Sequence, residues 1–330
     1  MSDIRDVAKL AGVSPSTVSR VLNGKIPVNP DTKEKVLAAI KELNYQPNAM
    51  AQVLKGGRIN TIGLFLPNVR NLVFPAVIQG IEDTAKKHGY IVVVCNTDED
   101  VEKEKFYIEN LRRRLVDGFI FCTARAGTKH LLELQDEGFP HIYLIRKSEQ
   151  LADAVILDNY AGACLATEYL VGQGHRRIAL INGPRDVLLF QDRFAGYKDA
   201  LAKAGIALDE NLIIHDIHSW DDGYQAMVKL LALPEKPDAV FATSDPKAIG
   251  AIQAIVDAGL AVPQDISVMG FDDSDPARMT VPLLTTVAQP FYEMGAKACE
   301  RLIKNIEGKR NMKPKIDVFP AELVIRKSVK

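Results

Sequence analysis

The order of apolar and polar residues divides the chain into two parts with different periodicities. In residues 1–57 apolar side chains recur every three or four positions, which is the spacing of short amphipathic helices. From residue 59 onward, nearly continuous apolar runs alternate with helical segments. Such runs, rich in β-branched residues, are typical of parallel strands covered by helices on both faces. The pattern predicts a small helical domain followed by a larger α/β domain.

Three short helices are predicted in the first part. The first follows a cap at Ser2 or Asp3 and ends at Gly12, which supplies a left-handed turn. The second begins at Ser14 with Pro15 in its first turn, and the third begins at residues 29–31 by the same device. The expected inward-facing positions of the second and third helices are Val18, Val21, Leu22, Val36, Leu37, Ile40 and Leu43. Helices joined by a glycine turn predict a helix-turn-helix unit.

The second helix carries an unusual number of hydroxyl groups in the run VSPSTVSRVLNG. Serine and threonine are poor helix formers, but in a DNA major groove they can bond to phosphates and base edges. Pro15 and Ser16 are expected to face the bases, and Arg20 suits the O6 and N7 atoms of guanine. The other polar positions are expected to touch phosphate or brace the helix: Ser14, Thr17, Ser19 and Asn23.

Charge and composition agree with this interpretation. Residues 1–57 hold eight Lys/Arg against five Asp/Glu, whereas the remainder holds 33 against 37. A basic N-terminal module suits a polyanionic partner. The four cysteines are far apart and form no CxxC pair, so we expect buried reduced thiols and neither a metal nor a cofactor. Without a signal peptide or a long apolar run, the chain is expected in the cytoplasm and not in a membrane.

Two series of apolar runs predict two similar α/β lobes with a cleft where their strand C-termini meet. The first series covers 61–67, 90–96, 117–122 and 141–145, and the second covers 177–183, 211–216, 238–243 and 266–272. Residues 285–290 are expected to return the chain to the first lobe, and a late strand near 321–326 to cross again. The expected domains are therefore 1–57 and 58–330, the latter comprising lobe 1 (about 60–158 and 288–320) and lobe 2 (about 159–287 and 321–330).

Polar residues that follow strands are candidates for binding a ligand in this cleft. Asn71 and Phe74 follow the first strand, and Asp245 follows a strand of the second lobe. Several arginines also lie near strand ends, namely Arg70, Arg125, Arg146 and Arg185. If two of them point inward, the ligand is an anion such as a sugar acid or sugar phosphate. Enzyme signatures such as a P-loop, HExxH or GxSxG are missing, which argues against catalysis.

The runs IRDVAKLAGVSPSTVSRVLNG and YQPNAMAQVLKGG closely resemble the lactose/purine repressor family of bacterial transcription regulators. The resemblance implies a hinge helix over about 48–55 that folds on operator DNA. Its candidate DNA-binding residues are Asn48, Gln52 and Leu54, with Leu54 wedged into the minor groove. A periplasmic-binding-protein-like effector domain and a homodimer on a palindromic operator are also implied.

The same resemblance assigns effector contacts to Arg193 and Asp272. His218 falls where family members commonly carry an aromatic side chain that stacks on the ligand, and Trp220 lies two residues further on, so either could serve. The implied function is a DNA-binding regulator, typically a repressor, controlled by a small-molecule effector such as a sugar, sugar acid or sugar phosphate. Whether that effector is an inducer or a corepressor stays open.

Three other interpretations are weighed against this one. A secreted sugar-binding protein would lack residues 1–57, and an enzyme would need a catalytic cluster that the sequence does not show. A catabolite-control-type regulator would bind a phosphorylated carrier protein, partly through an arginine in the helix after QPxYxxGA. Here that arginine is replaced by Glu300, which favours a small effector.

Overall fold

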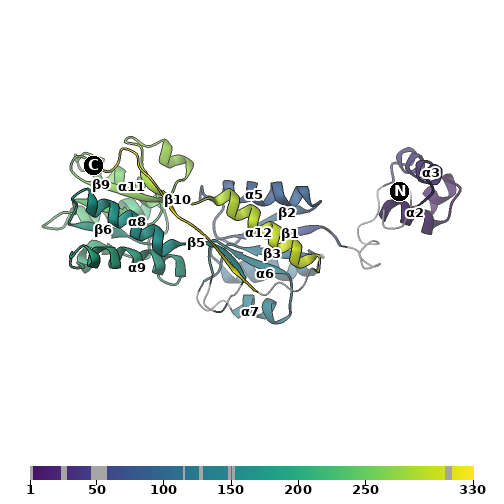
Figure 1. The fold of residues 1–330 in the computed structure, drawn as a ribbon, viewed down its shortest axis with the longest axis horizontal. Coiled ribbons are helices and arrows are strands. Elements are labelled where there is room, and N and C mark those ends of the chain that lie inside the picture. The colour runs from purple at the N-terminus through teal and green to yellow at the C-terminus, as the bar shows by residue number, and fades with distance from the viewer. Residues whose placement is uncertain are drawn as a thin grey trace. The chain divides into compact units, whose positions relative to one another are not determined.

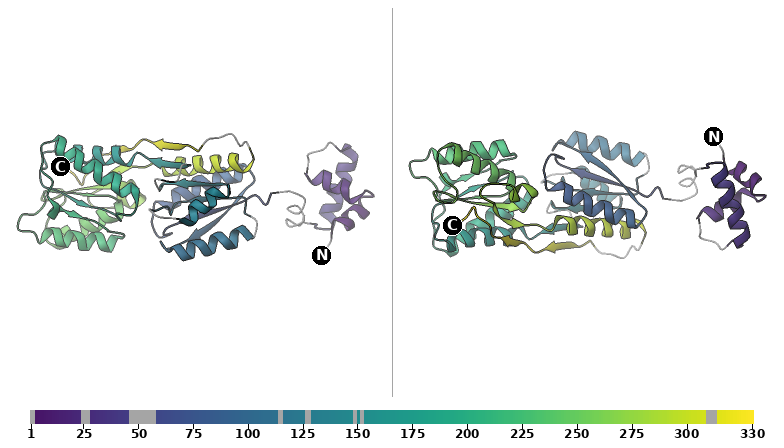
Figure 2. Two further views of the ribbon diagram at one scale, coloured as in Figure 1. Left: turned by 90° about the horizontal axis from the view of Figure 1, so that it is seen from below. Right: turned by 90° about the horizontal axis from the view of Figure 1, so that it is seen from above.

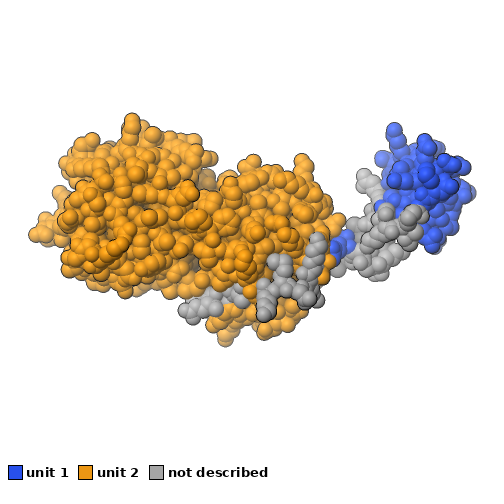
Figure 3. All heavy atoms as spheres, viewed as in Figure 1, with its two compact units in different colours: residues 1–59 blue, residues 60–330 orange. Residues whose placement is uncertain are grey.

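The computed structural model describes residues 3–23, 28–45, 58–113, 116–125, 129–147, 150, 153–308 and 314–330. They form two compact units, residues 1–59 and residues 60–330, which Figure 3 distinguishes by colour. Within these ranges no helix is long and apolar enough to cross a membrane.

The first unit consists of the three expected helices, α1 (Ile4–Leu10), α2 (Pro15–Asn23) and α3 (Pro30–Glu42). The side chain of Asp3 accepts hydrogen bonds from two backbone N–H groups of the first turn, and Asp6 completes a capping box. Gly12 has a φ of +65°, as the predicted left-handed turn requires. Ser14 and Asn29 cap α2 and α3 by accepting backbone N–H bonds of 3.2 and 2.9 Å.

The small core of this unit differs from the prediction at one position. Its fully buried side chains are Val7, Ala8, Val18, Val36 and Ala39. Leu37, which was predicted to be buried, is 48% exposed. The apolar face of α3 runs through positions 36, 39, 40 and 43, and one residue corresponds to 100° of rotation, so position 37 lies beside that face.

The second unit contains two six-stranded sheets with helices on both faces (Figures 1 and 2). The first sheet has the order β11-β5-β4-β3-β1-β2 and is parallel throughout. Its strands are β1 (Thr61–Leu66), β2 (Ile91–Asn96), β3 (Gly118–Phe121), β4 (His141–Leu144), β5 (Ala154–Leu157) and β11 (Ile316–Phe319). Helices α5 (Phe74–Lys87) and α12 (Phe291–Ile306) pack together on this lobe, which also contains α6 (Val101–Arg113) and α7 (Lys129–Asp136).

The second sheet has the order β12-β10-β9-β8-β6-β7 and is parallel except for the pairing of β12 with β10. Its strands are β6 (Ile178–Ile181), β7 (Ile213–Ile214), β8 (Ala239–Ala242), β9 (Ser267–Asp272), β10 (Thr285–Ala288) and β12 (Glu322–Val324). The helices of this lobe form two packed pairs, α8 (Asn159–Gly172) with α9 (Leu188–Lys203) and α10 (Trp220–Leu231) with α11 (Asp245–Asp257). Two short 3₁₀ helices, η1 (Glu210–Leu212) and η2 (Asp275–Arg278), complete it.

The chain passes between the lobes three times, after β5, after β10 and after β11. Residues 285–288 form β10 of the second sheet, and the return to the first lobe follows directly at α12. The backbone N–H of Asp158 in the first crossing donates to the carbonyl of Phe319 in the third, at 2.9 Å. The first and third crossings are therefore joined to each other.

Of the four cysteines, Cys95, Cys122 and Cys299 are buried, and all four are unpaired thiols. Cys164 was also expected to be buried but is only half-buried. Burial raises the pKa of Cys95 to about 11, so its thiol stays neutral.

Helices α5 and α12 approach each other closely at a glycine. A Cβ atom added at Gly80 would overlap the carbonyl oxygen of Tyr292. A glycine at such a site lets two backbones come into direct contact. The adjacent α12 glycine, Gly295, faces the backbone of Val77 in the same way.

Replacing Gly80 with alanine should lower the free energy of unfolding by about 2 kcal/mol, because the overlap is with backbone that cannot move aside. Urea denaturation of the full chain measures this change. Gly172→Ala is the control, since nothing lies within 4 Å of a Cβ there, and it should leave stability unchanged or raise it by about 0.5 kcal/mol. Equal effects of the two substitutions would contradict the close approach.

Candidate functional site

Helix α2 presents a polar, hydroxyl-rich start at the surface of the first unit. The Oγ of Ser14 lies 2.7 Å from that of Ser16 and 2.9 Å from Oγ1 of Thr17. Ser16 and Arg20 are both exposed, and they are four residues apart, on the same face of the helix. Pro15 is exposed, whereas Thr17 and Ser19 are half-buried. The helix therefore offers a guanidinium and hydroxyls on one face.

The other predicted DNA-contacting positions cannot be placed. The side chain of Asn23 and the whole of Asn48, Gln52 and Leu54 lie outside the described residues.

A second cluster of polar residues lies at the carboxyl ends of the strands of the second lobe. Arg193 of α9 is only 3% exposed, and its Nε donates to Oδ1 of Asn159 at 2.9 Å. Its guanidinium lies 3.6 Å from the centroid of the Phe271 ring, and its Nη1 lies 3.8 Å from Oδ1 of Asp272. Burial lowers the pKa of Arg193 to about 10, which keeps it charged near neutral pH. The structure thus brings the predicted Arg193 and Asp272 together.

Asp272 ends β9 in a backbone conformation that is costly for an L-residue, with a φ of +128°. Its Oδ1 accepts a 2.6 Å hydrogen bond from Nε2 of Gln289, the residue that follows β10. Burial raises the pKa of Asp272 to about 6, against the opposing effect of Arg193. Such backbone strain is often found at ligand-binding positions.

Asp245, at the start of α11, is fully buried, and its carboxylate bonds to Ser274 after β9 and to Thr286 of β10. Its Oδ2 accepts from the N–H and hydroxyl of Ser274 at 2.7 and 2.8 Å, and its Oδ1 accepts from the hydroxyl of Thr286 at 2.6 Å. Burial, and the nearby Asp272, raise its pKa to about 7. With these bonds made inside the protein, Asp245 positions the strand ends.

Sequence reasoning missed Lys247, which is also part of this cluster. It is 3% exposed, and its Nζ donates to Oγ of Ser244 at 3.0 Å. A lysine in the first turn of a helix is usually solvated, so its burial could not be read from the pattern. Two further polar residues after strands were missed, Thr123 and Asn182, each with a buried oxygen that has no hydrogen-bond partner within the described part of the chain.

The arginines of the first lobe do not form a free anion site. Arg146 donates two hydrogen bonds to Glu99, at 3.0 and 2.9 Å, and Arg125 contacts the same carboxylate at 2.6 Å. Burial opposes ionisation of Glu99, but these two guanidinium groups outweigh it and lower the pKa. Arg125 also pairs with Asp186 of the second lobe at 3.1 Å. Arg185 likewise pairs with Asp216 at 2.9 Å, so three of the four predicted cations are already matched by acids.

The remaining candidates occupy varied environments. His218 is exposed, and Trp220 is 40% exposed with its ring stacked on Tyr224 at 6.0 Å. Phe74 is buried at the start of α5, and Asn71 accepts a 3.3 Å bond from the N–H of Val73 in the loop after β1.

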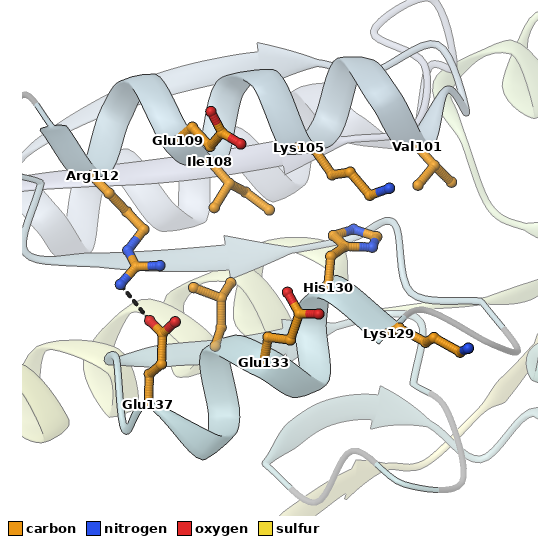
Figure 4. A pocket seen from close by; sticks show the side chains of 10 residues that line it. Val101, Lys105, Ile108, Glu109, Arg112, Lys129, His130, Glu133 and Glu137 are labelled. Carbon is orange, nitrogen blue, oxygen red and sulfur yellow. Dashed lines mark hydrogen bonds and ion pairs between the residues drawn. The ribbon is translucent and has the colours of Figure 1, made fainter.

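A groove of about 540 Å³ lies elsewhere, between α6 and α7 of the first lobe (Figure 4). Its lining mixes apolar residues such as Ile108 with charged ones, and Arg112 and Glu137 form an ion pair at one end. It includes none of the strand-end residues described above. The candidate site at the strand ends is therefore separate from this groove.

The raised pKa of Asp245 makes a prediction about stability. A carboxyl whose folded pKa of about 7 exceeds its unfolded value of about 4 contributes stability below pH 4 that is lost as the pH rises through 7. The free energy of unfolding should therefore fall by up to about 1 kcal/mol per pH unit from this group between pH 5 and pH 7. Asp245→Asn should flatten that slope, as measured by urea denaturation at several pH values. The exposed Asp221→Asn is the control, and a wild-type slope in Asp245→Asn would refute the assignment.

Comparison with known proteins identifies the family. Residues 3–48 match the family described as bacterial regulatory proteins, lacI family, and residues 167–329 match the periplasmic binding protein-like domain. The HTH-type transcriptional regulator RegA of Clostridium saccharobutylicum is 40% identical over 330 residues, which cover 99% of each chain.

Two solved structures are similar over almost the whole chain. The lac repressor dimer bound to operator and the anti-inducer ONPF has a TM-score of 0.88 and 32% identity, covering 99% of this chain and 98% of that one. The transcriptional regulator CelR in complex with cellobiose has a TM-score of 0.75 and 32% identity, covering 99% and 100%. The relatives are named regulators and repressors, a class of DNA-binding proteins that are not enzymes. This chain is accordingly a member of the LacI family of bacterial transcription regulators.

Proposed function

We propose that this protein is a cytoplasmic, sequence-specific transcriptional repressor controlled by a small molecule bound between the two lobes. The observation that carries the proposal is the exposed pair Ser16 and Arg20 on one face of α2, in a helix-turn-helix unit. The similarity to a repressor that was solved on its operator supports it.

The DNA-binding surface in this proposal lies in residues 1–57. Pro15, Ser16 and Arg20 read base edges in the major groove, while the hydroxyls near them bond to phosphate. Asn48, Gln52 and Leu54 belong to a hinge segment that contacts the minor groove. The other proposed contacts of this domain are Ser14, Thr17, Ser19 and Asn23.

The effector site lies in residues 58–330, where polar strand ends of both lobes converge. Buried polar groups that are held ready for a ligand fix its orientation and specificity. The proposed contacts are Asn71, Phe74, Arg193, His218, Trp220 and Asp272. Arg125, Arg146 and Asp245, which are already bonded within the protein, are proposed to line the site and to position these contacts. A sugar or sugar acid fits this setting, and the relative solved with cellobiose supports a sugar-like ligand.

Control of DNA binding follows from how the lobes are connected. The Arg125–Asp186 ion pair joins the two lobes at their strand ends, beside the proposed site. A ligand that binds one arrangement of the lobes more tightly shifts the population toward it. In the proposed dimer such a shift also changes the spacing of the two hinge segments, which alters operator binding.

An alternative is control by a phosphorylated carrier protein. Glu300 of α12 pairs with Lys304 one turn later, which places an acid where the catabolite-control-type regulators carry an arginine. An acidic residue repels a phosphate, so the small-molecule effector is favoured. A pull-down with serine-phosphorylated carrier protein separates the two, since only the alternative predicts retention.

The repressor is proposed to act as a homodimer, because one recognition helix reads only half of a palindrome. The segment between η2 and β10 exposes apolar side chains, with Met279 at 76% and Val281 at 90% exposure. The edge strand β2 exposes Ile91 at 64%. Exposed apolar side chains on a surface are typical of a protein–protein contact.

Arg20→Ala should weaken binding to the best palindrome selected from random duplex DNA by about 1–3 kcal/mol and relax the preference at one base pair of each half-site. Fluorescence anisotropy on a set of single-base operator variants measures both effects. The exposed Lys35→Ala of α3 is the control and should leave the base preference unchanged. An equal loss on all sequences would mean that Arg20 contacts phosphate only.

Val281→Asp should weaken self-association at least tenfold, because it places a charge in an apolar contact. Sedimentation of the full chain over a range of concentrations measures the dimer constant, and operator affinity should fall in parallel. An unchanged dimer constant would mean that the interface lies on another surface. Glu235→Gln, a polar change on an exposed residue, serves as the control.

A further inference from the structure

We propose that Lys247 selects the effector by binding a carboxylate group on it, so that the ligand is a sugar acid and not a neutral sugar. This inference rests on the proposed function in placing a small molecule between the lobes. It assigns recognition of the ligand's charge to Lys247, which the sequence analysis did not single out.

The ammonium of Lys247 is buried with little to compensate its charge. Its Nζ donates to the hydroxyl of Ser244 at 3.0 Å and lies 4.7 Å from the centroid of the Phe190 ring. Within the described residues no carboxylate oxygen lies within 4.0 Å of this nitrogen. A buried ammonium has three donors and strongly favours an anionic partner. Here two donors and the charge are left for a ligand.

Lys247 lies beside the predicted effector contact Arg193. The Nζ of Lys247 and the guanidinium of Arg193 lie 4.7 and 5.6 Å from the centroid of the same Phe190 ring. The charged groups that act on the ammonium are Asp272 of β9, Arg193 of α9, Asp222 of α10 and Arg146 after β4. Burial, countered by Asp272, lowers the pKa of Lys247 to about 7.

The local charges favour a single negative charge on the ligand. Arg193 and Lys247 provide two cations. Asp272 lies 3.8 Å from the guanidinium of Arg193, whereas the neighbouring Asp245, whose pKa burial raises to about 7, is largely neutral below that pH. A carboxylate would compensate the remaining cation, whereas a phosphate dianion would be placed next to Asp272. A neutral sugar would leave the buried ammonium uncompensated. Arg125 and Arg146 of the first lobe are already paired with Glu99. The role of binding the carboxylate is therefore left to Lys247.

A first experiment needs no ligand. Lys247→Met has similar length and removes the buried charge, so it should raise the melting temperature of the full chain by a few degrees. A lysine that merely supports the fold would do the opposite, and a lower melting temperature would overturn the proposal. The exposed Lys229→Met of α10 is the matched control and should have little effect.

A second experiment tests the ligand's charge. Calorimetric titration compares D-gluconate and D-galacturonate with their neutral counterparts, D-glucitol and D-galactose. For the wild type we expect one of the acids to bind at least tenfold more tightly than its counterpart. Lys247→Met should abolish that preference, and Lys247→Arg should retain part of it. Tighter binding of a neutral sugar, or an unchanged preference in Lys247→Met, would overturn the proposal; if none of the four binds, the melting comparison decides.

A pH series adds a signature that a structural role would not give. Binding of a carboxylate should weaken as the pH rises through 7, because the free lysine then loses its proton. Asp245 and Asp272 also titrate near this range. Their contribution to the pH dependence of binding is the part that remains in Lys247→Met. Operator binding is measured separately, without and with the two acids. Its absence under both conditions would refute the proposed function, whereas its presence with no carboxylate preference would refute only the role of Lys247.

Discussion

The second unit depends on one constraint, which is that the carboxyl ends of two parallel sheets are brought face to face. Parallel strands are buried on both faces and present their polar residues only where they end. At these ends the protein buries Arg193, Asp245, Lys247 and Asp272. Each of these groups loses hydration on folding, so each must find a partner in the protein or in a ligand. Both the fixed conformation of the loops and the chemistry of the site follow from that requirement.

The two lobes meet this requirement in different ways. In the first lobe, Glu99 binds Arg125 and Arg146, so that the charges are compensated within the protein. In the second lobe, Asp245 is saturated by Ser274 and Thr286, while Lys247 has only a hydroxyl and an aromatic face. In such a site most polar groups have partners within the protein and a few do not. The site can therefore discriminate between ligands, because only a ligand that supplies the missing partners binds tightly.

Much of this architecture could be predicted from the sequence, since apolar periodicity and capping residues are local signals. The three N-terminal helices and nine of the strands agree with the structure. Arg193 and Asp272, which the family resemblance assigned to the effector, lie close together. The short strands β5 and β11, the exposure of Leu37 and the burial of Lys247 could not be predicted in the same way. Each depends on what packs against the residue in three dimensions. The pairing of Glu99 with two arginines was equally hidden, because its partners are 26 and 47 residues away.

The three crossings between the lobes have a mechanical consequence. The hydrogen bond from Asp158 to Phe319 holds the first and third crossings together, and their strands β5 and β11 pair in the first sheet. In the second sheet β10, which precedes the second crossing, pairs with β12, which follows the third. Bodies connected by several adjacent strips resist torsion and sliding but can still bend about the line that the strips define. Motion of the lobes is therefore confined to nearly one degree of freedom, and a small ligand needs to supply only enough energy to choose a point along that single coordinate.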